Sequence, residues 1–390
     1  MPRFIQGHAT HPDAHMALAL AAAQLDAQMG SHGAGKAFSP TLGWIYFSEH
    51  YQSHADGLLS ELQLRWPGTA WVGGSAIGVC ATATEYFDEP ALVLMLCDLP
   101  QEQFQIFSGI HPLRHWPAET ALVHSDSSNP DLPALLDELA VQTHSQYLFG
   151  GITSGRMQGV QIANGVWQGG LSGVAFGPDV SLVSRVSQGC RSLGRTRHIT
   201  QCERNLVLTL NDQPALDCLM HDLTLPAQPA QGDWRGTIAR LRHTLVALHL
   251  DTQAAVRAGS YGDEVLVRHL LGIDPARRGI LVADVPELGQ PLSFCERNAE
   301  AARRDLMRIC TEIREELEDH DASPVRMSGA IYISCSGRGG AHFGAPHAEL
   351  QWIQHALGDM PLAGFFAGGE IAHQNIYGYT GVLTVFLSPA

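Results

Sequence analysis

Short apolar runs of strand length are distributed along the whole chain, and several of them stop at paired glycines. The runs lie at 43–48, 70–72, 91–97, 148–149, 206–210, 330–334 and 364–366. A continuous apolar run predicts a strand that is buried on both faces. Glycine adopts backbone angles that a Cβ forbids, so the glycines predict strand ends where the backbone approaches a ligand closely.

Apolar residues at spacings of three and four predict helices between these strands. The helical segments are 13–30, 53–64, 131–141, 238–250, 296–320 and 348–357, and 166–186 has the alternation and turn residues of a hairpin. Such a hairpin does not fit a purely parallel sheet. We therefore expect a mixed α/β (α+β) fold in which each domain has mixed or antiparallel sheets flanked by helices, layered as αββα.

The length of 390 residues predicts two domains. The boundary is best placed at 225–233, because this segment is rich in Pro, Gln and Ala and has no periodic pattern. The predicted domains are therefore 12–224 and 234–388. Both contain apolar runs that stop at paired glycines.

The composition narrows the class of protein. With 45% apolar and 16% charged residues the chain can bury large cores. The low charge indicates a face that is covered by a partner protein or by self-association into a homo-oligomer. A formal net charge of −15 argues against partners such as nucleic acid or anionic membranes. No window approaches the roughly 18 apolar residues of a membrane-spanning helix.

Cysteine usage and the first residues predict a cytoplasmic location. The 8 cysteines occur singly and form no C-x-x-C motif, which fits a reducing compartment. The segment 1–30 has no basic stretch before an apolar core, as a signal peptide would require.

Arg338 and Glu370 are the charged residues that follow two of the glycine-bounded runs in the C-terminal half. A guanidinium offers a planar fork to a carboxylate, and a carboxylate accepts hydrogen bonds from an ammonium group. The two side chains are therefore predicted to hold both ends of an amino-acid-like ligand. The alternative is that they pair with each other and staple two strand ends.

The other predicted ligand contacts surround this pair. From the same two stretches they are Cys335, Gly337, Gly339, His373, Tyr379 and Thr380, and from the upstream strand ends Gly73, Gly74, Ser75, Gly150 and Gly151. Arg338, Glu370 and Tyr379 are the expected principal contacts, and the upstream residues are expected to line an adjoining wall.

Cys335 raises a catalytic alternative, a Cys-dependent hydrolase. The thiol at a strand end would be the nucleophile, with His342 or His373 as the base. A thiolate also needs an activating geometry that the spacing does not establish. A buried thiol that lines the site is the simpler interpretation, so we predict no catalytic residue and no enzymatic activity.

The 20 histidines raise the question of a metal or of haem. His11/His15, His50/His54 and His111/His115 each lie four residues apart, but no third ligand is near any pair in the sequence. One axial histidine is enough for haem, so His243 and His249 on the predicted 238–250 helix are also candidates. Haem stays open as a cofactor, and the identity of any metal ligand stays unknown.

Several separated stretches resemble the FIST N and FIST C domains. The C-terminal ones are ISCSGRGG at 333–340, PLAGFFAGGEI at 361–371 and IYGYTGVLTVF at 376–386; the N-terminal ones are VGGSAIG at 72–78, LFGGITSG at 148–155 and the segment 189–217. The resemblance extends over residues 12–386.

The resemblance implies a sensory module of signal transduction that binds a small ligand, with amino acids as one ligand class. Because no output domain is recognisable, it also implies output through a partner protein such as a histidine kinase. Some FIST proteins are haem-binding nitric-oxide sensors that regulate such a kinase, and this function is the alternative.

Overall fold

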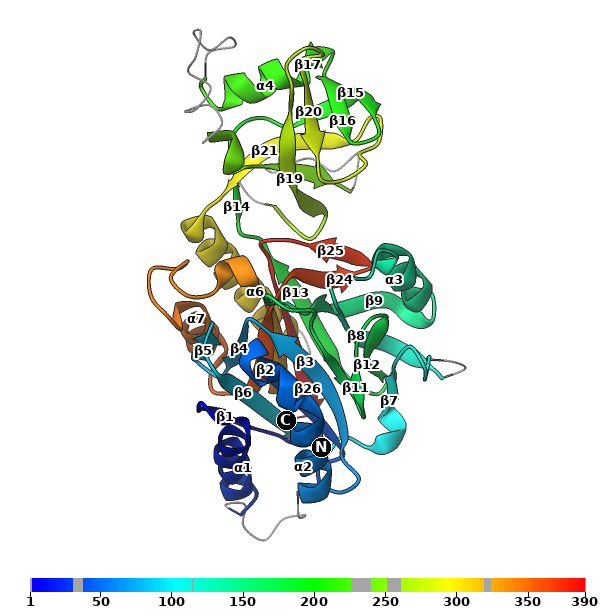
Figure 1. Cartoon of the computed structure of the whole chain (residues 1–390), viewed down its shortest axis with the longest axis vertical. Helices are drawn as coiled ribbons and strands as arrows, with labels where there is room; N and C mark the ends of the chain where they lie inside the picture. Colours follow the sequence, from blue (N-terminus) through cyan, green and yellow to red (C-terminus); the bar gives the residue numbers. More distant parts are fainter. Residues whose placement is uncertain are drawn as a thin grey trace. The chain divides into compact units, whose positions relative to one another are not determined.

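The computed structural model describes residues 2–30, 38–113, 116–225, 240–250, 261–318 and 324–389 (Figure 1). These residues form two units: unit 1 is Met1–Ser187 with Leu306–Ala390, and unit 2 is Gln188–Asp305. Both combine helices with mixed or antiparallel sheets, which confirms the predicted α+β class. The predicted linker 225–233 falls almost wholly outside the described residues, so the boundaries 12–224 and 234–388 stay a prediction.

The described part of unit 1 contains three six-stranded sheets. Sheet 1 has the order β1 (Phe4–Thr10), β6 (Ala91–Cys97), β2 (Leu42–Ser48), β3 (Ala70–Ala76), β10 (Gln161–Ala163), β11 (Val166–Trp167). Sheet 2 has the order β7 (Phe104–Phe107), β12 (Leu171–Phe176), β8 (Ala118–Ser125), β9 (Thr143–Ile152), β24 (Gly369–His373), β25 (Asn375–Tyr377). Sheet 3 has the order β13 (Leu182–Ser187), β26 (Gly381–Pro389), β22 (Val325–Cys335), β23 (Leu362–Ala367), β4 (Gly78–Ala81), β5 (Thr84–Phe87).

These sheets share one plan. Each centres on a parallel pair, β2–β3, β8–β9 or β22–β23, and the two strands are connected through helix α2 (Ala55–Arg65), α3 (Leu132–Ala140) or α7 (Ala348–Leu357). The hairpin that follows each second strand joins a different sheet: β4–β5 joins sheet 3, β10–β11 joins sheet 1, and β24–β25 joins sheet 2. Unit 1 is thus built from three β-α-β repeats that exchange hairpins in a cycle.

One glycine in the second strand of each repeat permits the close parallel pairing. A Cβ at this position would almost overlap the carbonyl oxygen of the register partner, at 1.8 Å from Ile45 for Gly73, 1.9 Å from Val123 for Gly150 and 1.7 Å from Tyr332 for Gly364. Gly73, Gly74 and Ser75 therefore lie within β3, and Gly150 and Gly151 within β9. The prediction that these residues mark the ends of the strands is wrong, because tight strand packing also requires glycine.

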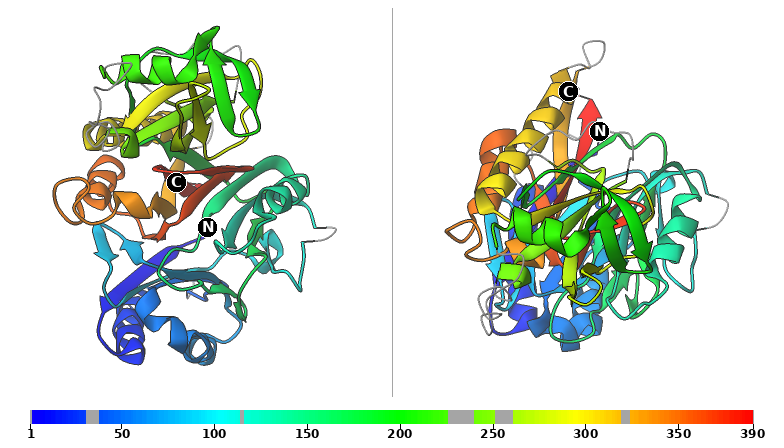
Figure 2. Two further views of the ribbon diagram at one scale, coloured as in Figure 1. Left: turned by 45° about the horizontal axis from the view of Figure 1, so that its top comes forward. Right: turned by 90° about the horizontal axis from the view of Figure 1, so that it is seen from above.

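The three sheets meet at an aromatic cluster in the core of unit 1. The ring of Phe386 in sheet 3 lies 4.9 Å from Phe4 and 5.7 Å from Trp44 in sheet 1, and 5.4 Å from Phe176 in sheet 2, between centroids. Helices cover the outer faces: α1 (Ala14–Gly30) and α2 pack on sheet 1, α3 on sheet 2, and α6 (Ala299–Glu318) and α7 on sheet 3 (Figure 2). Helices outside packed sheets agree with the predicted class.

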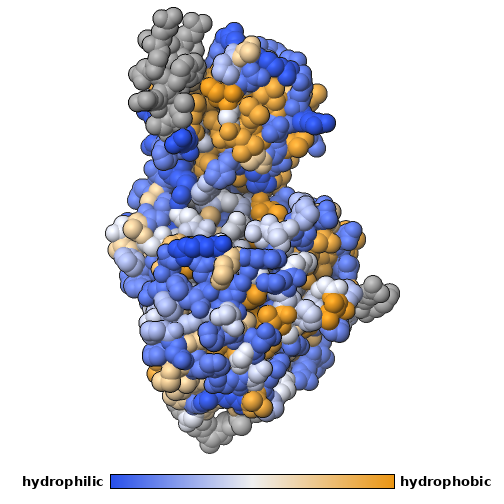
Figure 3. Space-filling view, in the orientation of Figure 1, coloured by the Kyte–Doolittle hydropathy of each residue, from blue (hydrophilic) through white to orange (hydrophobic). Residues whose placement is uncertain are grey.

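The described residues of unit 2 form one antiparallel sheet. Its order is β14 (Cys190–Ser192), β21 (Pro291–Arg297), β15 (Arg197–Glu203), β16 (Leu206–Leu210), β20 (Gly279–Val282), β19 (Val265–Asp274), β18 (Thr244–His249), with β17 (Gln213–Pro214) beside β16. β18 also pairs with β21, which closes the sheet, and α4 (Ala215–Asp222) packs on it. Figure 3 shows apolar side chains gathered on one face of this unit, and Leu271, Val285 and Leu288 are among its exposed apolar residues.

Two predicted elements are wrong. Residues 244–249 form strand β18 instead of continuing a helix at 238–250, because they pair with β19 and β21 from distant parts of the chain; residues 226–239 lie outside the described residues. The segment 166–186 is not a hairpin, because β11, β12 and β13 belong to three different sheets. Turn residues indicate where a strand ends but not which sheet the next strand joins.

Candidate functional site

Arg338 is held by a buried ion pair at the end of strand β22. The strand ends at Cys335, and a single 3-10 turn, η3 (Ser336–Arg338), directs the guanidinium inward, where it is 1% exposed. Nε and Nη2 of Arg338 donate to Oε1 of Glu349 at 2.8 and 2.5 Å. The alternative that Arg338 pairs with Glu370 is therefore wrong, since its ion-pair partner is Glu349.

Glu349 lies in the first turn of α7 and is fully engaged. The Tyr332 hydroxyl donates to its Oε1 at 2.7 Å, and the Ser334 hydroxyl donates to its Oε2 at 2.9 Å. Both donors project from β22, so the strand, the turn and the helix are joined through one carboxylate. Buried charges of this kind persist because each is paired and hydrogen-bonded.

The outer edge of the Arg338 guanidinium makes longer contacts. Nη1 donates to the carbonyl oxygens of Ser187 and Tyr379, each at 3.4 Å, and Nη2 donates to the Ser187 hydroxyl at 3.3 Å. The guanidinium also lies 5.4 Å from the ring centroid of Phe343. Compared with the edge facing Glu349, this edge is weakly bound, and it faces the Tyr379–Thr380 segment.

Glu370 is hydrogen-bonded to the same segment. Its Oε2 accepts hydrogen bonds from the Thr380 amide at 3.1 Å and from the Thr380 hydroxyl at 2.7 Å. Its Oε1 has no hydrogen-bond partner among the described residues, although the carboxyl group is fully buried. Burial raises the pKa of Glu370 to about 8, while Thr380, Arg338 and Cys335 act in the opposite direction. A buried carboxyl oxygen without a hydrogen-bond partner is an acceptor that a ligand donor can satisfy.

Cys335 lies within electrostatic reach of both side chains but is not activated. Its backbone amide donates to the Thr380 carbonyl at 2.9 Å. Burial, together with the nearby Glu370 carboxyl, raises the pKa of Cys335 to about 12. A nucleophilic cysteine needs a lowered pKa, so this environment favours the buried thiol over the hydrolase.

We expect Cys335 to resist alkylation by iodoacetamide at pH 7.5 in the folded protein, because the thiolate is the reacting species. Peptide mass mapping after a timed reaction measures this, with the half-buried Cys202 as the internal comparison and urea-unfolded protein as the reference. Labelling of Cys335 at the rate seen in urea would contradict the prediction.

The remaining predicted contacts divide into two groups. Gly337, Gly339, Tyr379 and Thr380 lie around Arg338 and Glu370, and Gly151 is the register partner of Glu370, with Gly150 next to it in β9. His373 ends β24, where its ring packs against Tyr147 at 4.7 Å. Gly73, Gly74 and Ser75 belong to sheet 1, where Ser75 bonds to the Val160 amide. The structure thus assembles the C-terminal group with Gly151 and places the β3 group in another sheet.

Models of two protein-family domains match consecutive parts of the chain. A model of the FIST N domain matches residues 41–213, and a model of the FIST C domain matches residues 215–373. The chain belongs to the FIST family. The chain is also similar to an uncharacterized protein of Mycobacterium tuberculosis, 29% identical over 399 residues, and to one of Mycobacterium bovis, 31% identical over 401 residues. Each alignment covers 98% of both chains.

FIST domains are small-ligand-binding sensory domains in signal transduction, so the resemblance seen in the sequence is confirmed at this level. Among the helices that the structure describes, none has the length and apolar character needed to cross a membrane.

Two carboxylates of this FIST site were missed in the sequence. Glu349 shares the buried face of α7 with Leu350, Ile353 and Leu357, and its i,i+4 spacing to Ile353 was the available signal. Glu85 lies in β5, 4% exposed, and its Oε1 accepts the Gly340 amide at 3.2 Å. Burial raises the pKa of Glu85 to about 7. Glu85 reaches Gly340 because the β4–β5 hairpin of the first repeat joins sheet 3. No local sequence pattern predicts this pairing.

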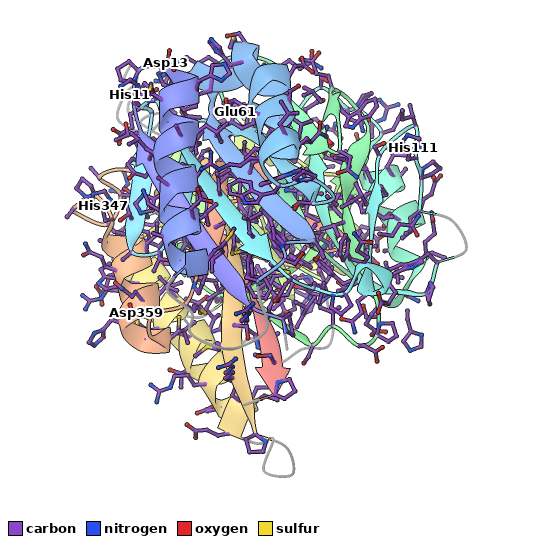
Figure 4. All side chains as sticks on the ribbon, turned by 90° about the horizontal axis from the view of Figure 1, so that it is seen from below. His11, Asp13, Glu61, His111, His347 and Asp359 are labelled. Carbon is purple, nitrogen blue, oxygen red and sulfur yellow. The ribbon has the colours of Figure 1, made fainter. Side chains whose placement is uncertain are left out.

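The histidine candidates that the structure describes lie in several different elements. His15 pairs with Glu61 at 2.9 Å. His11 accepts a hydrogen bond from the Asp13 amide within its own turn (Figure 4). His115 lies outside the described residues. His243 is exposed, and His249 is a buried strand residue whose ring packs against Tyr261. No group of three metal-ligating His, Cys, Asp or Glu side chains occurs in the part of the chain that the structure covers.

Proposed function

We propose that this FIST protein senses an amino-acid-like ligand that binds between Arg338 and Glu370. The observation that carries the proposal is the unpartnered Oε1 of Glu370, which is buried beside a guanidinium whose outer edge is weakly bound. An ammonium group would supply the donor that Glu370 lacks, and a carboxylate would replace the long contacts of Arg338 Nη1. The other ends of both side chains are held by Glu349 and Thr380.

Binding requires the Tyr379–Thr380 segment to move, since it is hydrogen-bonded to both side chains. Tyr379 adopts a left-handed φ of 65°, which costs free energy for a non-glycine residue. A ligand that binds the opened arrangement better than the closed one shifts the equilibrium between them. The output is then read by a cytoplasmic signalling partner, such as a histidine kinase.

The test is a thermal-shift screen of the L-amino acids against wild type, Glu370→Gln and the control Glu61→Gln. The glutamine can still accept from Thr380 but cannot pair with an ammonium ion. We expect at least one amino acid to raise Tm of wild type and of the control, and to lose its effect on Glu370→Gln. Arg338→Ala is avoided because it would strand Glu349.

Ligands that carry only one of the two charged groups of an amino acid test each contact separately. Propylamine should respond to Glu370→Gln, whereas propionate should not, because only the amine addresses the carboxyl group. If every amino acid that shifts Tm shifts it equally in Glu370→Gln, the ligand does not bind at this site.

A further inference from the structure

Unit 1 contains a hollow at the end of strands β22 and β26 that lies away from Arg338. Its volume is about 730 Å³, within the range of small-molecule sites. It is lined by the start of β1, by residues 98–103 and 179–181, by the start of β22 and by the end of β26. β22 has 11 residues, so at about 3.3 Å per residue the hollow lies about 30 Å from Arg338.

The floor of this hollow is apolar. Phe4 and Phe386 pack ring against ring at 4.9 Å, and Leu99 and Val180 add aliphatic surface. A smaller hollow of about 330 Å³ adjoins it and shares Arg3, Phe4 and Arg326. The lining therefore favours a ligand with an apolar body.

The two arginines that line the hollow differ in their partners. Arg3 is neutralised by Asp98, which accepts its Nε at 3.3 Å and its backbone amide at 2.5 Å. Arg326 is exposed, and among the described residues its guanidinium makes one long hydrogen bond, from Nε to the Ser388 hydroxyl at 3.4 Å, and no ion pair. The other carboxylate of the lining, Asp179, is exposed to solvent. One guanidinium is thus left to receive an anion beside an apolar floor.

We infer that this hollow binds a monocarboxylate with an aliphatic or aromatic body, whose carboxylate pairs with Arg326 and whose body lies on Phe4 and Phe386. A guanidinium and a carboxylate form charge-assisted hydrogen bonds, and the apolar body gains from leaving water. This site is independent of the proposed ligand site at Arg338 and Glu370.

Calorimetric titration with octanoate tests the inference, with acetate and octyltrimethylammonium as probes of charge alone and of the opposite charge. Octanoate is expected to bind wild type and to bind Arg326→Gln at least about tenfold more weakly, because one charge-assisted contact is lost. The matched control is Arg314→Gln, an exposed arginine of α6, which should bind as wild type does.

Two further variants keep the test decisive. Ser181→Trp fills the hollow from an exposed position and should abolish binding, while Asp179→Asn should tighten it by removing a repulsive charge. Glu370→Gln should leave octanoate binding unchanged, which separates this site from the proposed one. Equal binding by Arg326→Gln and wild type, weaker binding by Asp179→Asn, or preference for the ammonium probe would each overturn the assignment.

Discussion

Glu349→Ala is expected to lower the free energy of unfolding by about 3–5 kcal/mol, because it leaves the guanidinium of Arg338 buried without a counter-charge. The same change removes the acceptor of the Tyr332 and Ser334 hydroxyls, both of which are buried. Urea unfolding at pH 7, followed by circular dichroism, measures the difference.

The comparison variants separate the stranded charge from the loss of packing. Arg338→Met/Glu349→Leu removes both charges and should recover much of the stability, since an apolar pair of similar volume often replaces a buried ion pair without loss. Asp26→Ala breaks the exposed ion pair with Arg65 and should cost less than about 1 kcal/mol. A Glu349→Ala protein as stable as Asp26→Ala would show that Arg338 is not enclosed as described.

Glu370 should make the protein less stable as the pH rises from about 4.5 to about 8. The pKa of Glu370 is raised from 4.5 to about 8 by burial, so across this window the unfolded chain has lost a proton that the folded protein keeps. Stability therefore falls by up to about 1.4 kcal/mol per pH unit from this group, the reverse of a carboxylate held by a salt bridge. Glu370→Gln should flatten the decline, most clearly between pH 7 and 8.

Part of the slope should remain in Glu370→Gln. Burial also raises the pKa of Glu85, to about 7, so this second carboxyl lowers stability in the same direction between pH 4.5 and 7. Urea titrations at half-unit pH steps of wild type, Glu370→Gln and Glu85→Gln resolve the two windows. Parallel curves for wild type and Glu370→Gln above pH 7 would mean that the carboxyl is ionised in the folded protein.

The proton on Glu370 also bears on ligand binding. An ammonium ligand binds the ionised carboxyl better than the protonated one, so ligand and proton compete for the same group. The proposed sensor would then respond more strongly above pH 8 than at pH 6, a dependence that Glu370→Gln would abolish.

Much of the fold follows from local sequence patterns. The continuous apolar runs at 91–97 and 330–334 became buried strands, and the helices expected at 296–320 and 348–357 are α6 and α7 within a few residues. A strand that is buried on both faces requires a continuous apolar run, and an amphipathic helix requires apolar residues at spacings of three and four. Both patterns can therefore be recognised in the sequence. The strands that precede Arg338 and Glu370 predict that both lie at one end of the sheets, and in the structure both hydrogen-bond to the Tyr379–Thr380 segment.

The pairing of strands from distant parts of the chain leaves no recognisable pattern in the sequence. The exchange of hairpins brings Glu85 from the first repeat and Gly151 from the second to the residues of the third, and it splits 166–186 among three sheets. A strand carries the same hydrophobic pattern whichever neighbour it joins, because its backbone hydrogen bonds are alike for every partner. The local pattern thus prescribed the strands, the helices and the charged residues at their ends, whereas folding in space chose Glu349 as the partner of Arg338 and left Glu370 with an unmatched oxygen.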